Sequence, residues 1–454
     1  MSVRRHSLAA ILLSASLAIP VEASAGGFYL QELSPKETGR AMAGAAAAGD
    51  DPSTVYFNPA AMTNLPGIQT SVGGVALMAS AHQANRGSIA TGNGPATLPF
   101  PGFPVVPLSA PITGTDGGNP FDKVIPIPSF YATAQLSQRL WLGIGVNAPF
   151  GLKLDYGDAF FGRYDSVYTD LKTYNIQPSL AYKLTDSLSV GGGVDVQYVK
   201  VTLTNAVPNP ALIGVPFNSP ASSSFLPGSM PDLLVTAKGH DWSFGWNAGL
   251  FYTRGGTNLG IHYRSRMTHR VEGDQTLSGP SLPSYLTRPL SLTAPLDLPD
   301  IVKVSMTHSL TPRLRAMLTG RWYNWSRFKN IAITTAAGTS VKDLRYHDSY
   351  SASVGGEYDV SPALTLRAGT MFDRTPTNKQ LLTTRVPDGD RVWLTGGATW
   401  NASRALALNL SYAHVFVAKA DIVRIDHYSA GTAITRSQAS GNADQIAASL
   451  TARF

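Results

Sequence analysis

Hydrophobic and polar residues alternate with a period of two in a series of short runs that begins near residue 67. In the run 240–253, Trp242, Phe244 and Trp246 share one face, and the residues between them are small or polar. One apolar and one polar face is typical of a half-buried β-strand. The fourteen predicted strands are 68–80, 127–137, 140–149, 170–184, 188–204, 240–253, 257–271, 296–310, 313–327, 346–359, 363–373, 390–401, 404–417 and 441–454.

The connections between these runs are alternately tight and long. Tight ones lie at 137–138, 185–186, 255–256, 311–312, 361–362 and 402–403, and long ones at 81–126, 150–169, 205–239, 272–295, 328–345, 374–389 and 418–440. An antiparallel sheet connected in this way has its turns at one end and its long loops at the other. An even strand number with short periplasmic turns describes an outer-membrane barrel, and one-sided long loops are uncommon in soluble sandwiches. We therefore predict an all-β fold, a 14-stranded antiparallel transmembrane β-barrel.

The first 25 residues have the features of a secretory signal peptide: a pair of arginines, a short apolar stretch and a small-residue cleavage site. Cleavage after Ala25 would make Gly26 the first mature residue, and cleavage after Ala23 is the alternative. Export and the barrel pattern together predict a multi-pass protein of the bacterial outer membrane.

The stretch 39–62 differs from the rest of the chain, because it is rich in small residues and does not alternate. Its part 40–48 contains strong helix formers, so a short helix is expected there. A fourteen-stranded lumen is too wide for side chains alone to fill. We therefore expect residues 26–66, the hatch segment, to plug the lumen. The predicted domains are a signal peptide at 1–25, the hatch at 26–66 and the barrel at 67–454.

The composition and the absence of certain motifs exclude several classes of function. The full chain carries a formal charge of +7 without any block of Lys or Arg, which, with export, argues against nucleic acid as a partner. Cysteine is absent, so no disulfide framework holds the fold. Nucleophile-elbow, zinc-protease and phosphate-loop motifs are also absent. We expect no enzyme activity, no metal and no cofactor, with a barrel lipase as the remaining enzymatic alternative.

Aromatic residues lie near both ends of the predicted strands, as expected at the two membrane boundaries. Those near the tight turns are Trp141, Tyr182, Tyr252, Tyr358 and Trp400, and those toward the long loops are Tyr198, Tyr263, Trp322, Tyr323, Trp325 and Tyr412. The terminal Phe454 resembles the assembly signal of outer-membrane barrels. The expected partners are therefore the barrel assembly machinery, the lipid bilayer and lipopolysaccharide, around a monomer.

Motifs along the mature chain resemble the FadL/TodX family of outer-membrane transporters for long-chain fatty acids and hydrophobic aromatics. They are GRAMAG (39–44), NPA (58–60), NAPFGL (147–152), WSFGWNAG (242–249), YRS (263–265), LPD (298–300), WSRF (325–328), RAG (367–369), FD (372–373) and VPDGDRVW (386–393). The resemblance implies capture of the ligand at the outer face and an inner pocket near the mature N-terminus. It also implies release sideways into the membrane, through a gap made by a kink in the third strand.

In this sequence the third strand ends in Asn147, Pro149, Phe150 and Gly151, which the resemblance makes the lateral gate. Proline cannot donate to a strand ladder and glycine weakens one, so a break in pairing is reasonable here. The alternative is that Pro149 merely begins a loop.

Four residues are predicted to bind substrate. Phe28 is the apolar candidate from the N-terminus, and the resemblance places head-group cations at Lys200 and at Arg327 or Lys329. Continued alternation of the ninth strand would direct Arg327 and Lys329 into the lumen. Lys200 shares the parity of lipid-facing residues, so a one-residue bulge near Tyr198 is needed to turn it inward. Each cation could instead be a solvated residue of the lumen or interface.

In the hatch motif Asn58-Pro59-Ala60, we expect Asn58 to hydrogen-bond the hatch to the barrel and Pro59 to fix the turn, with direct ligand contact as the alternative. The predicted function is passive transport of hydrophobic compounds, foremost long-chain fatty acids. Uptake of uncharged aromatic hydrocarbons, a non-transport adhesin and an open porin for hydrophilic solutes are the alternatives.

Overall fold

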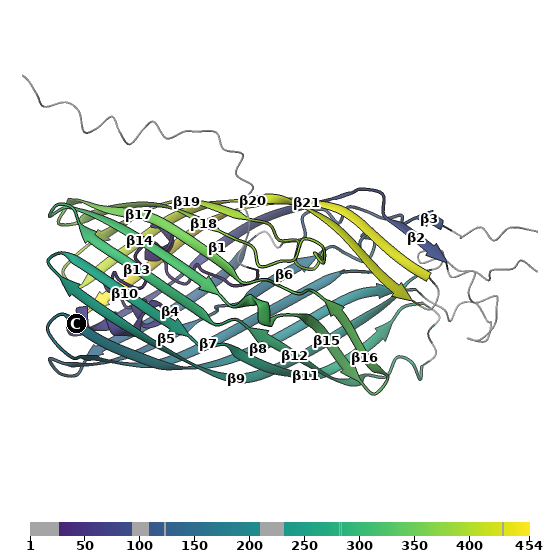
Figure 1. Cartoon of the computed structure of the whole chain (residues 1–454), viewed down its shortest axis with the longest axis horizontal. Helices are drawn as coiled ribbons and strands as arrows, with labels where there is room; N and C mark the ends of the chain where they lie inside the picture. Colours follow the sequence, from purple (N-terminus) through teal and green to yellow (C-terminus); the bar gives the residue numbers. More distant parts are fainter. Residues whose placement is uncertain are drawn as a thin grey trace, which may run out of the picture.

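The computed structural model describes residues 27–92, 109–121, 124–208, 231–280, 282, 284–428 and 431–454; the predicted signal peptide lies outside them. A single antiparallel sheet closes on itself, because the first strand β1 (Ile68–Asn85) pairs along its length with the last strand β21 (Gly431–Arg453). Figure 1 shows the resulting elongated barrel, with the C-terminus at the end that carries the tight turns. No helix in the described ranges is long and apolar enough to cross a membrane.

The wall has fourteen strands, as predicted. Nine are single elements: β1, β4 (Ile125–Gln135), β7 (Tyr168–Lys183), β8 (Leu188–Val207), β9 (Leu233–Arg254), β18 (Leu364–Asp373), β19 (Arg391–Asn401), β20 (Leu406–Tyr428) and β21. The other five are built from β5 (Leu140–Asn147) with β6 (Gly151–Asp155), β10 (Thr257–Arg264) with β11 (Met267–Ser278), β12 (Leu290–Leu298) with β13 (Ile301–Ser309), β14 (Leu314–Tyr323) with β15 (Asn330–Thr335), and β16 (Gly338–Asp343) with β17 (Ser349–Ser361). The short strands β2 (Ile89–Gly92) and β3 (Ser109–Pro111) pair at the loop end.

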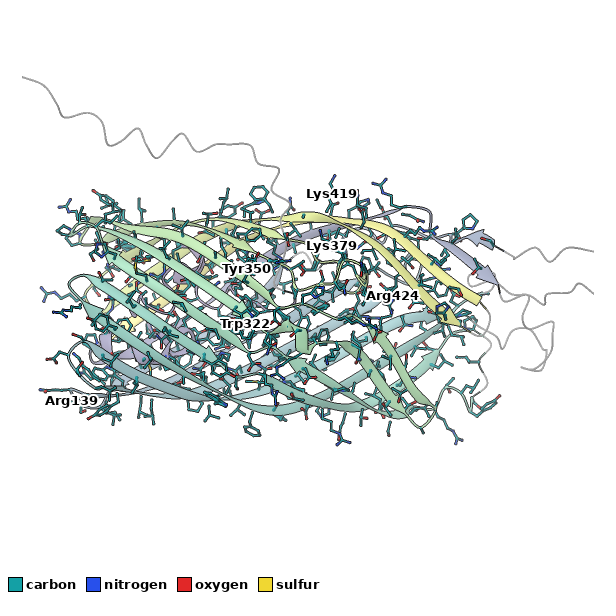
Figure 2. The ribbon with its side chains drawn as sticks, viewed as in Figure 1. Arg139, Trp322, Tyr350, Lys379, Lys419 and Arg424 are labelled. Carbon is teal, nitrogen blue, oxygen red and sulfur yellow. The ribbon has the colours of Figure 1, made fainter. Side chains whose placement is uncertain are left out.

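The predicted alternation places large apolar side chains on the outer wall. Phe244 is 69% exposed, and Trp322 and Tyr350, which are cross-strand partners, lie on the outside in Figure 2. Three aromatics assigned to the membrane belts are instead buried inside: Trp141, Tyr323 and Trp325. Trp141 shows the reason, because its indole N–H donates to the Leu65 carbonyl of the hatch segment at 2.8 Å.

The described part of the hatch segment lies within the barrel and is mostly buried (Figure 1). It contains α1 (Pro35–Thr38), α2 (Thr54–Phe57) and the 3-10 helix η1 (Pro59–Asn64); a further 3-10 turn, η4 (Trp325–Arg327), follows β14. Small residues on both sides permit this close packing. A Cβ atom on Gly260 of β10 would collide with the Ala46 carbonyl.

The helix expected at 40–48 does not form, and this stretch consists of turns. Ala41 and Met42 have φ angles of 51° and 59°, in the left-handed region that interrupts a right-handed helix. Barrel side chains accept hydrogen bonds from two backbone N–H groups of this stretch, those of Gly44 and Ala46. The backbone N–H of Gly44 donates to Thr319 Oγ1 at 2.9 Å, so tertiary contacts override local propensity here.

Candidate functional site

The third barrel strand is interrupted between β5 and β6. Pairing of β4 with β5 stops at Phe130 and Val146, and β6 resumes the strand by pairing with β7. The residues at the interruption bond to the hatch segment instead: Leu30 N–H donates to the Pro149 carbonyl at 2.8 Å, and Gly151 N–H donates to the Phe28 carbonyl at 3.0 Å. The break predicted at Pro149 is therefore a true interruption within a strand. Among the described residues, it leaves 125–129 of β4 without ladder partners on that side.

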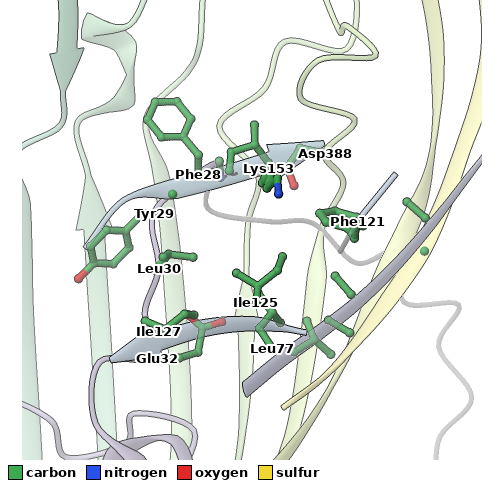
Figure 3. A pocket seen from close by; sticks show the side chains of 18 of the residues that line it. Phe28, Tyr29, Leu30, Glu32, Leu77, Phe121, Ile125, Ile127, Lys153 and Asp388 are labelled. Carbon is green, nitrogen blue, oxygen red and sulfur yellow. Dashed lines mark hydrogen bonds between the residues drawn. The ribbon is translucent and has the colours of Figure 1, made fainter. Parts of the chain in front are cut away.

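A cavity of about 510 Å³ lies at this interruption. Figure 3 shows its wall, with Phe28 and Leu30 contributed by the hatch segment, Ile125 and Ile127 by β4, and Lys153 by β6.

The same cavity is also lined by Pro128 and Tyr174, which are exposed on the outside of the barrel. The cavity thus connects the interior with the outer wall.

A second, smaller cavity of about 80 Å³ adjoins the first on the other side of Phe28. Its lining is almost entirely apolar and includes Leu171, Val201, Leu203, Leu296, Phe328 and Ile331. The Phe28 ring centroid lies 4.8 Å from that of Trp325, 5.5 Å from that of Phe328 and 6.1 Å from that of Phe150. Phe28 is therefore packed in an aromatic cluster at the boundary of the two cavities.

Lys200 lies on the outer wall, and the bulge predicted near Tyr198 is absent. The pairing of β8 with β9 continues in a single register from residue 188 to residue 207. The expectation that Lys200 turns inward is therefore wrong. The apolar pattern that suggested a bulge has another cause: Val199 and Val201 face the lumen because the upper lumen is itself apolar.

Arg327 and Lys329 are also exposed and line neither cavity. The strand β14 ends at Tyr323, and the turn η4 that follows abolishes the alternation on which the lumen assignment depended. Arg327 Nε instead contacts Asp300 Oδ2 at 3.0 Å, with its side chain 41% exposed. The prediction that these two cations face the lumen is therefore wrong.

The charged groups that do line the larger cavity were not singled out from the sequence. They are Glu32 of the hatch, Lys153, Asp170, Lys172, Asp388 and Arg391. Asp388 Oδ2 accepts from the Gly27 N–H at 3.2 Å and from the Thr375 hydroxyl at 2.6 Å, and burial raises the pKa of Asp388 to about 6.

Within the described residues, five buried atoms of residues that line this cavity have no hydrogen-bond partner: Arg391 Nε, Glu32 Oε2, Asp170 Oδ1, Trp393 Nε1 and Gln445 Oε1. Unpartnered buried polar atoms are rare, so these are available to a ligand. The motif 386–393 was a signal that could have directed attention to Asp388 and Arg391.

One further cation, Arg385, is buried at the edge of the smaller cavity. Its guanidinium donates to the carbonyls of Tyr168, Asp165 and Thr204 and to the Thr169 hydroxyl. None of these acceptors is a carboxylate, so its positive charge is not directly neutralised by them.

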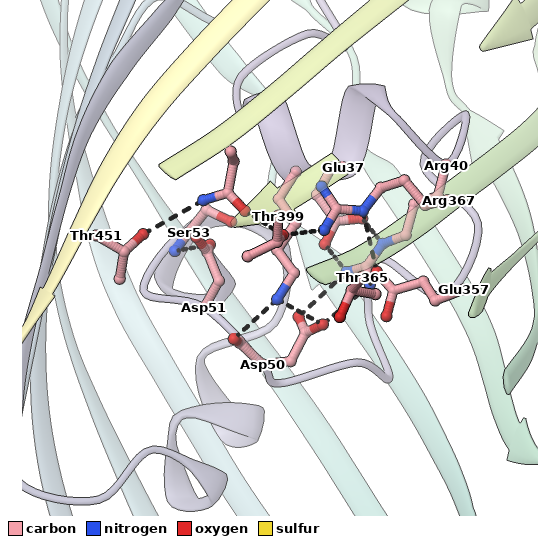
Figure 4. Close-up of polar contacts among 12 residues, drawn as sticks. Glu37, Arg40, Asp50, Asp51, Ser53, Glu357, Thr365, Arg367, Thr399 and Thr451 are labelled. Atoms are coloured by element: carbon pink, nitrogen blue, oxygen red, sulfur yellow. Dashed lines mark hydrogen bonds and ion pairs between the residues drawn. The ribbon is translucent and has the colours of Figure 1, made fainter. Parts of the chain in front are cut away.

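The body of the hatch segment is joined to the wall by a buried charge network, shown in Figure 4. The Arg40 guanidinium contacts carboxylates of Glu37, Asp50 and Glu357, and Glu357 also contacts Arg367 at 3.2 Å. Charge-assisted hydrogen bonds of this kind are the stronger ones in proteins. They hold the hatch body against β17 and β18.

The bond expected between Asn58 and the barrel is present. Asn58 Nδ2 donates to the Leu250 carbonyl of β9 at 2.9 Å and to the Ala46 carbonyl at 2.7 Å. Its side-chain oxygen accepts from the Ala60 N–H at 3.2 Å, and Pro59 begins η1. These three residues line neither cavity, so their contacts are with the hatch and the wall.

An outer-membrane barrel with an occupied lumen and an opening in its wall is the class that this fold and site define. The family described as "Outer membrane protein transport protein (OMPP1/FadL/TodX)" matches residues 16–454, and the chain belongs to this family. The protein is accordingly an outer-membrane transporter of hydrophobic substrates.

Named relatives and solved structures agree with this assignment. The chain is 29% identical to outer membrane protein P1 of Haemophilus influenzae over 426 residues, which covers 89% of each chain. It is 26% identical to the long-chain fatty acid transport protein of Escherichia coli over 430 residues, covering 87% of this chain and 89% of the relative.

The fold is similar to that of a Pseudomonas aeruginosa FadL homologue, with a TM-score of 0.80 and 24% identity over 94% of this chain and all of the other. The Pseudomonas putida toluene transporter TodX gives a TM-score of 0.65 at 17% identity, again over 94% of this chain and all of the other.

Proposed function

We propose that the protein transports hydrophobic molecules passively and releases them sideways into the membrane through the opening between β4 and β6. One observation carries this proposal: a single cavity is lined both by Phe28 of the hatch and by Tyr174 of the outer wall. Lipid tails are as apolar as the cavity wall, so a ligand can leave without being exposed to water. A path straight through the lumen would instead require the charge network around Arg40 to separate.

We further propose long-chain fatty acids as the main substrates. The two cavities adjoin at Phe28 and together offer elongated apolar space, which suits a long tail. The tail's carboxylate needs a cation, and Arg391 has an unpartnered Nε atom beside the larger cavity. The Escherichia coli relative named as a long-chain fatty acid transport protein supports the same class.

An uncharged aromatic hydrocarbon is the second candidate. The larger cavity is lined by three acidic and three basic residues, so a carboxylate would meet acidic groups as well as bases: Glu32, Asp170 and Asp388, and Lys153, Lys172 and Arg391. A ligand without charge would avoid this repulsion. The fold similarity to a toluene transporter is compatible with this candidate.

The substrate test is uptake of radiolabelled oleate and toluene by cells that lack their own transporter and express this chain. Gain of oleate uptake supports the main proposal, and no gain for either compound contradicts transport. Arg391→Ala should lower oleate uptake about tenfold and leave toluene uptake unchanged. Arg139→Ala, at an exposed turn, is the matched control. Equal oleate uptake by both variants would favour the uncharged hydrocarbon.

The route is tested by obstructing the opening. Ala148 lines the larger cavity at the interruption, so Ala148→Trp should fill the exit and strongly reduce uptake. Ala132 lies on the paired part of β4, opposite Ile144, and Ala132→Trp is the control for a bulky residue on the closed wall. Undiminished uptake by Ala148→Trp would contradict the sideways route.

A further inference from the structure

The edge of β4 that faces the opening carries prolines at alternate positions, Pro126 and Pro128. The direction of their nitrogen atoms follows from two neighbouring bonds. Gln135 N–H donates toward β1, to the Gly67 carbonyl at 2.9 Å, and Leu136 N–H donates to the Leu140 carbonyl at the start of β5, at 2.9 Å. Successive residues of a strand donate to opposite sides, so even-numbered residues of β4 direct their nitrogen atoms toward β5 and the opening.

These prolines weaken any extension of the β4–β5 ladder. The last pair is Phe130 with Val146, and the same register would next place Pro128 opposite Ala148 and Pro126 opposite Phe150. At these positions an antiparallel pair exchanges two hydrogen bonds. Proline has no N–H, so each of the two additional pairs would lose one of its bonds.

Two backbone donors on the opposite edge have partners outside the sheet. Gly151 N–H donates to the Phe28 carbonyl at 3.0 Å, and Asp155 N–H donates to the Pro120 carbonyl at 2.8 Å. Phe150 N–H is directed to the other side, toward β7, where it donates to Thr173 Oγ1 at 2.9 Å. An open sheet edge is not tolerated in a bilayer unless its polar groups are satisfied. Here the hatch and a loop accept hydrogen bonds from the edge of β6, and the edge of β4 lacks donors at its two prolines.

A single proline elsewhere in the wall has a smaller effect. Pro178 of β7 directs its nitrogen toward β8, because the odd-numbered Lys183 donates toward β5, to the Arg139 carbonyl at 2.9 Å. The β7–β8 ladder nevertheless resumes in the same register on both sides of it, at Ile176 with Val196 and at Ser179 with Gly193. One missing donor thus leaves the wall closed.

We propose that Pro126 and Pro128 are positioning residues that keep the lateral opening from closing, because they remove two successive donors from the edge of β4. The functional meaning of this inference rests on the proposed sideways release. A chain with ordinary residues at both positions would extend the ladder across residues 125–129 and close the exit.

The structural test uses cysteine pairs, since the chain contains no cysteine. In the extended register, positions 127 and 149 would face each other at a closely spaced, non-hydrogen-bonded pair, which suits a disulfide. Ile127→Cys with Pro149→Cys is made in the parent and in Pro126→Thr/Pro128→Thr. Two added backbone bonds should raise disulfide yield by about tenfold or more. Equal yields in the two backgrounds would overturn the proposal.

Pro178→Thr with the same cysteine pair is the control and should not raise the yield. Folding of each variant is checked by its heat-dependent migration in gels. If the double variant does not insert, Pro126→Thr and Pro128→Thr are tested singly, and each should give an intermediate yield. No increase in either single variant would also overturn the proposal.

Uptake by the cysteine-free Pro126→Thr/Pro128→Thr variant separates this inference from the proposed function. Reduced uptake together with a higher disulfide yield supports both. A higher yield with unchanged uptake supports the role of the prolines and contradicts sideways release. An unchanged yield, with uptake still blocked by Ala148→Trp, contradicts the role of the prolines and supports the route.

Discussion

Two parts of the hatch segment contact the barrel through different chemistry. The body, residues 34–65, is joined to the wall by buried charges around Arg40 and by hydrogen bonds such as that from Thr63 to Ser189, at 2.8 Å. The N-terminal end, residues 27–32, contacts aromatic rings and the edge of the interrupted strand beside the cavities. It also makes charge-assisted hydrogen bonds at Gln31 and Glu32, such as that from Gln31 Nε2 to Asp373 Oδ2 at 2.8 Å. Breaking a buried ion pair costs about 3–5 kcal/mol, whereas an aromatic pair contributes about 0.5–1.5 kcal/mol.

This difference indicates where the hatch can move. A ligand that enters the larger cavity meets Phe28 and Leu30, which are the weakly held part, and does not meet the charge network. On the proposed sideways route, only residues near Phe28 would therefore need to shift for release, and the body of the hatch could stay in place. Substitutions in the body, in the N-terminal end and on the outer wall should therefore have different effects.

The largest effect is expected from Arg40→Met. It leaves the Glu37 carboxylate without its buried partner and removes one of the arginines that contact Glu357, and the body of the hatch should lose about 3–5 kcal/mol of stabilisation. The barrel should remain inserted but become permeable to large hydrophilic antibiotics, which growth assays measure. Arg139→Met is the control at an exposed turn. An unchanged antibiotic barrier would show that the network does not hold the body in place.

Asp388 should make the stability of the N-terminal end of the hatch segment depend on pH, and this effect should be smaller than that of Arg40→Met. Its pKa of about 6 exceeds the value of about 3.9 in an unfolded chain, because burial disfavours the charged form. The folded state therefore binds the proton more tightly, so stability is highest below pH 4 and decreases as the pH rises to 6. The two pKa values set an upper limit of about 3 kcal/mol.

Asp388→Asn should remove this dependence and stabilise residues 27–32 at pH 7.5. Hydrogen exchange of that segment, corrected for the chemical rate at each pH, is compared at pH 5 and pH 7.5. Wild-type protein should be better protected at pH 5, and the variant should be equally protected at both. Asp421→Asn, on the exposed part of β20, should behave as wild type. The same pH dependence in Asp388→Asn would contradict the assignment.

Phe28→Leu should have a more modest effect. The substitution keeps an apolar side chain but removes the ring contacts to Trp325, Phe328 and Phe150, so local opening of residues 27–32 should increase about tenfold. Hydrogen exchange of the same segment measures this change. Phe244→Leu, on the outer wall, is the control. Unaltered exchange in Phe28→Leu would show that the aromatic cluster does not restrain this end.

The fold was predictable because its determinants are local. Strand alternation, turn residues and loop lengths are properties of neighbouring positions, and they correctly gave fourteen strands. The interruption near Pro149 was implied by the family resemblance, and the local sequence left a simple loop as its alternative. The helix at 40–48 failed because Thr319 and other distant barrel groups determine its hydrogen bonds. Local patterns contain no information about such contacts.

The site was less predictable for a related reason. Its charged lining joins the start of the mature chain to a loop near its end, since Gly27 and Asp388 are 361 positions apart. Assigning alternate side chains of a strand to the lumen or to the lipid also assumes an apolar exterior and a polar lumen. That assumption holds in the lower barrel, where Asp195 and Gln197 face inward, and fails in the apolar upper lumen around Val201.

The smallest effect on uptake is expected from Lys200→Ala. This variant tests the conclusion that Lys200 lies on the outer wall and does not bind substrate. Lys200 lies opposite Lys172 and His240 on the outer wall, so its removal takes away only a solvated charge beside another lysine. Like charges in this position are mildly destabilising, and surface substitutions of this kind change stability by about 0.5 kcal/mol or less. Oleate uptake by Lys200→Ala should therefore stay within about twofold of wild type, while Arg391→Ala in the same cells shows the loss expected of a head-group cation. If Lys200→Ala lost as much uptake as Arg391→Ala, the side chain would have to reach the ligand during transport. The regular ladder of β8 and β9 would then have to rearrange, because in its present register Lys200 lines neither cavity.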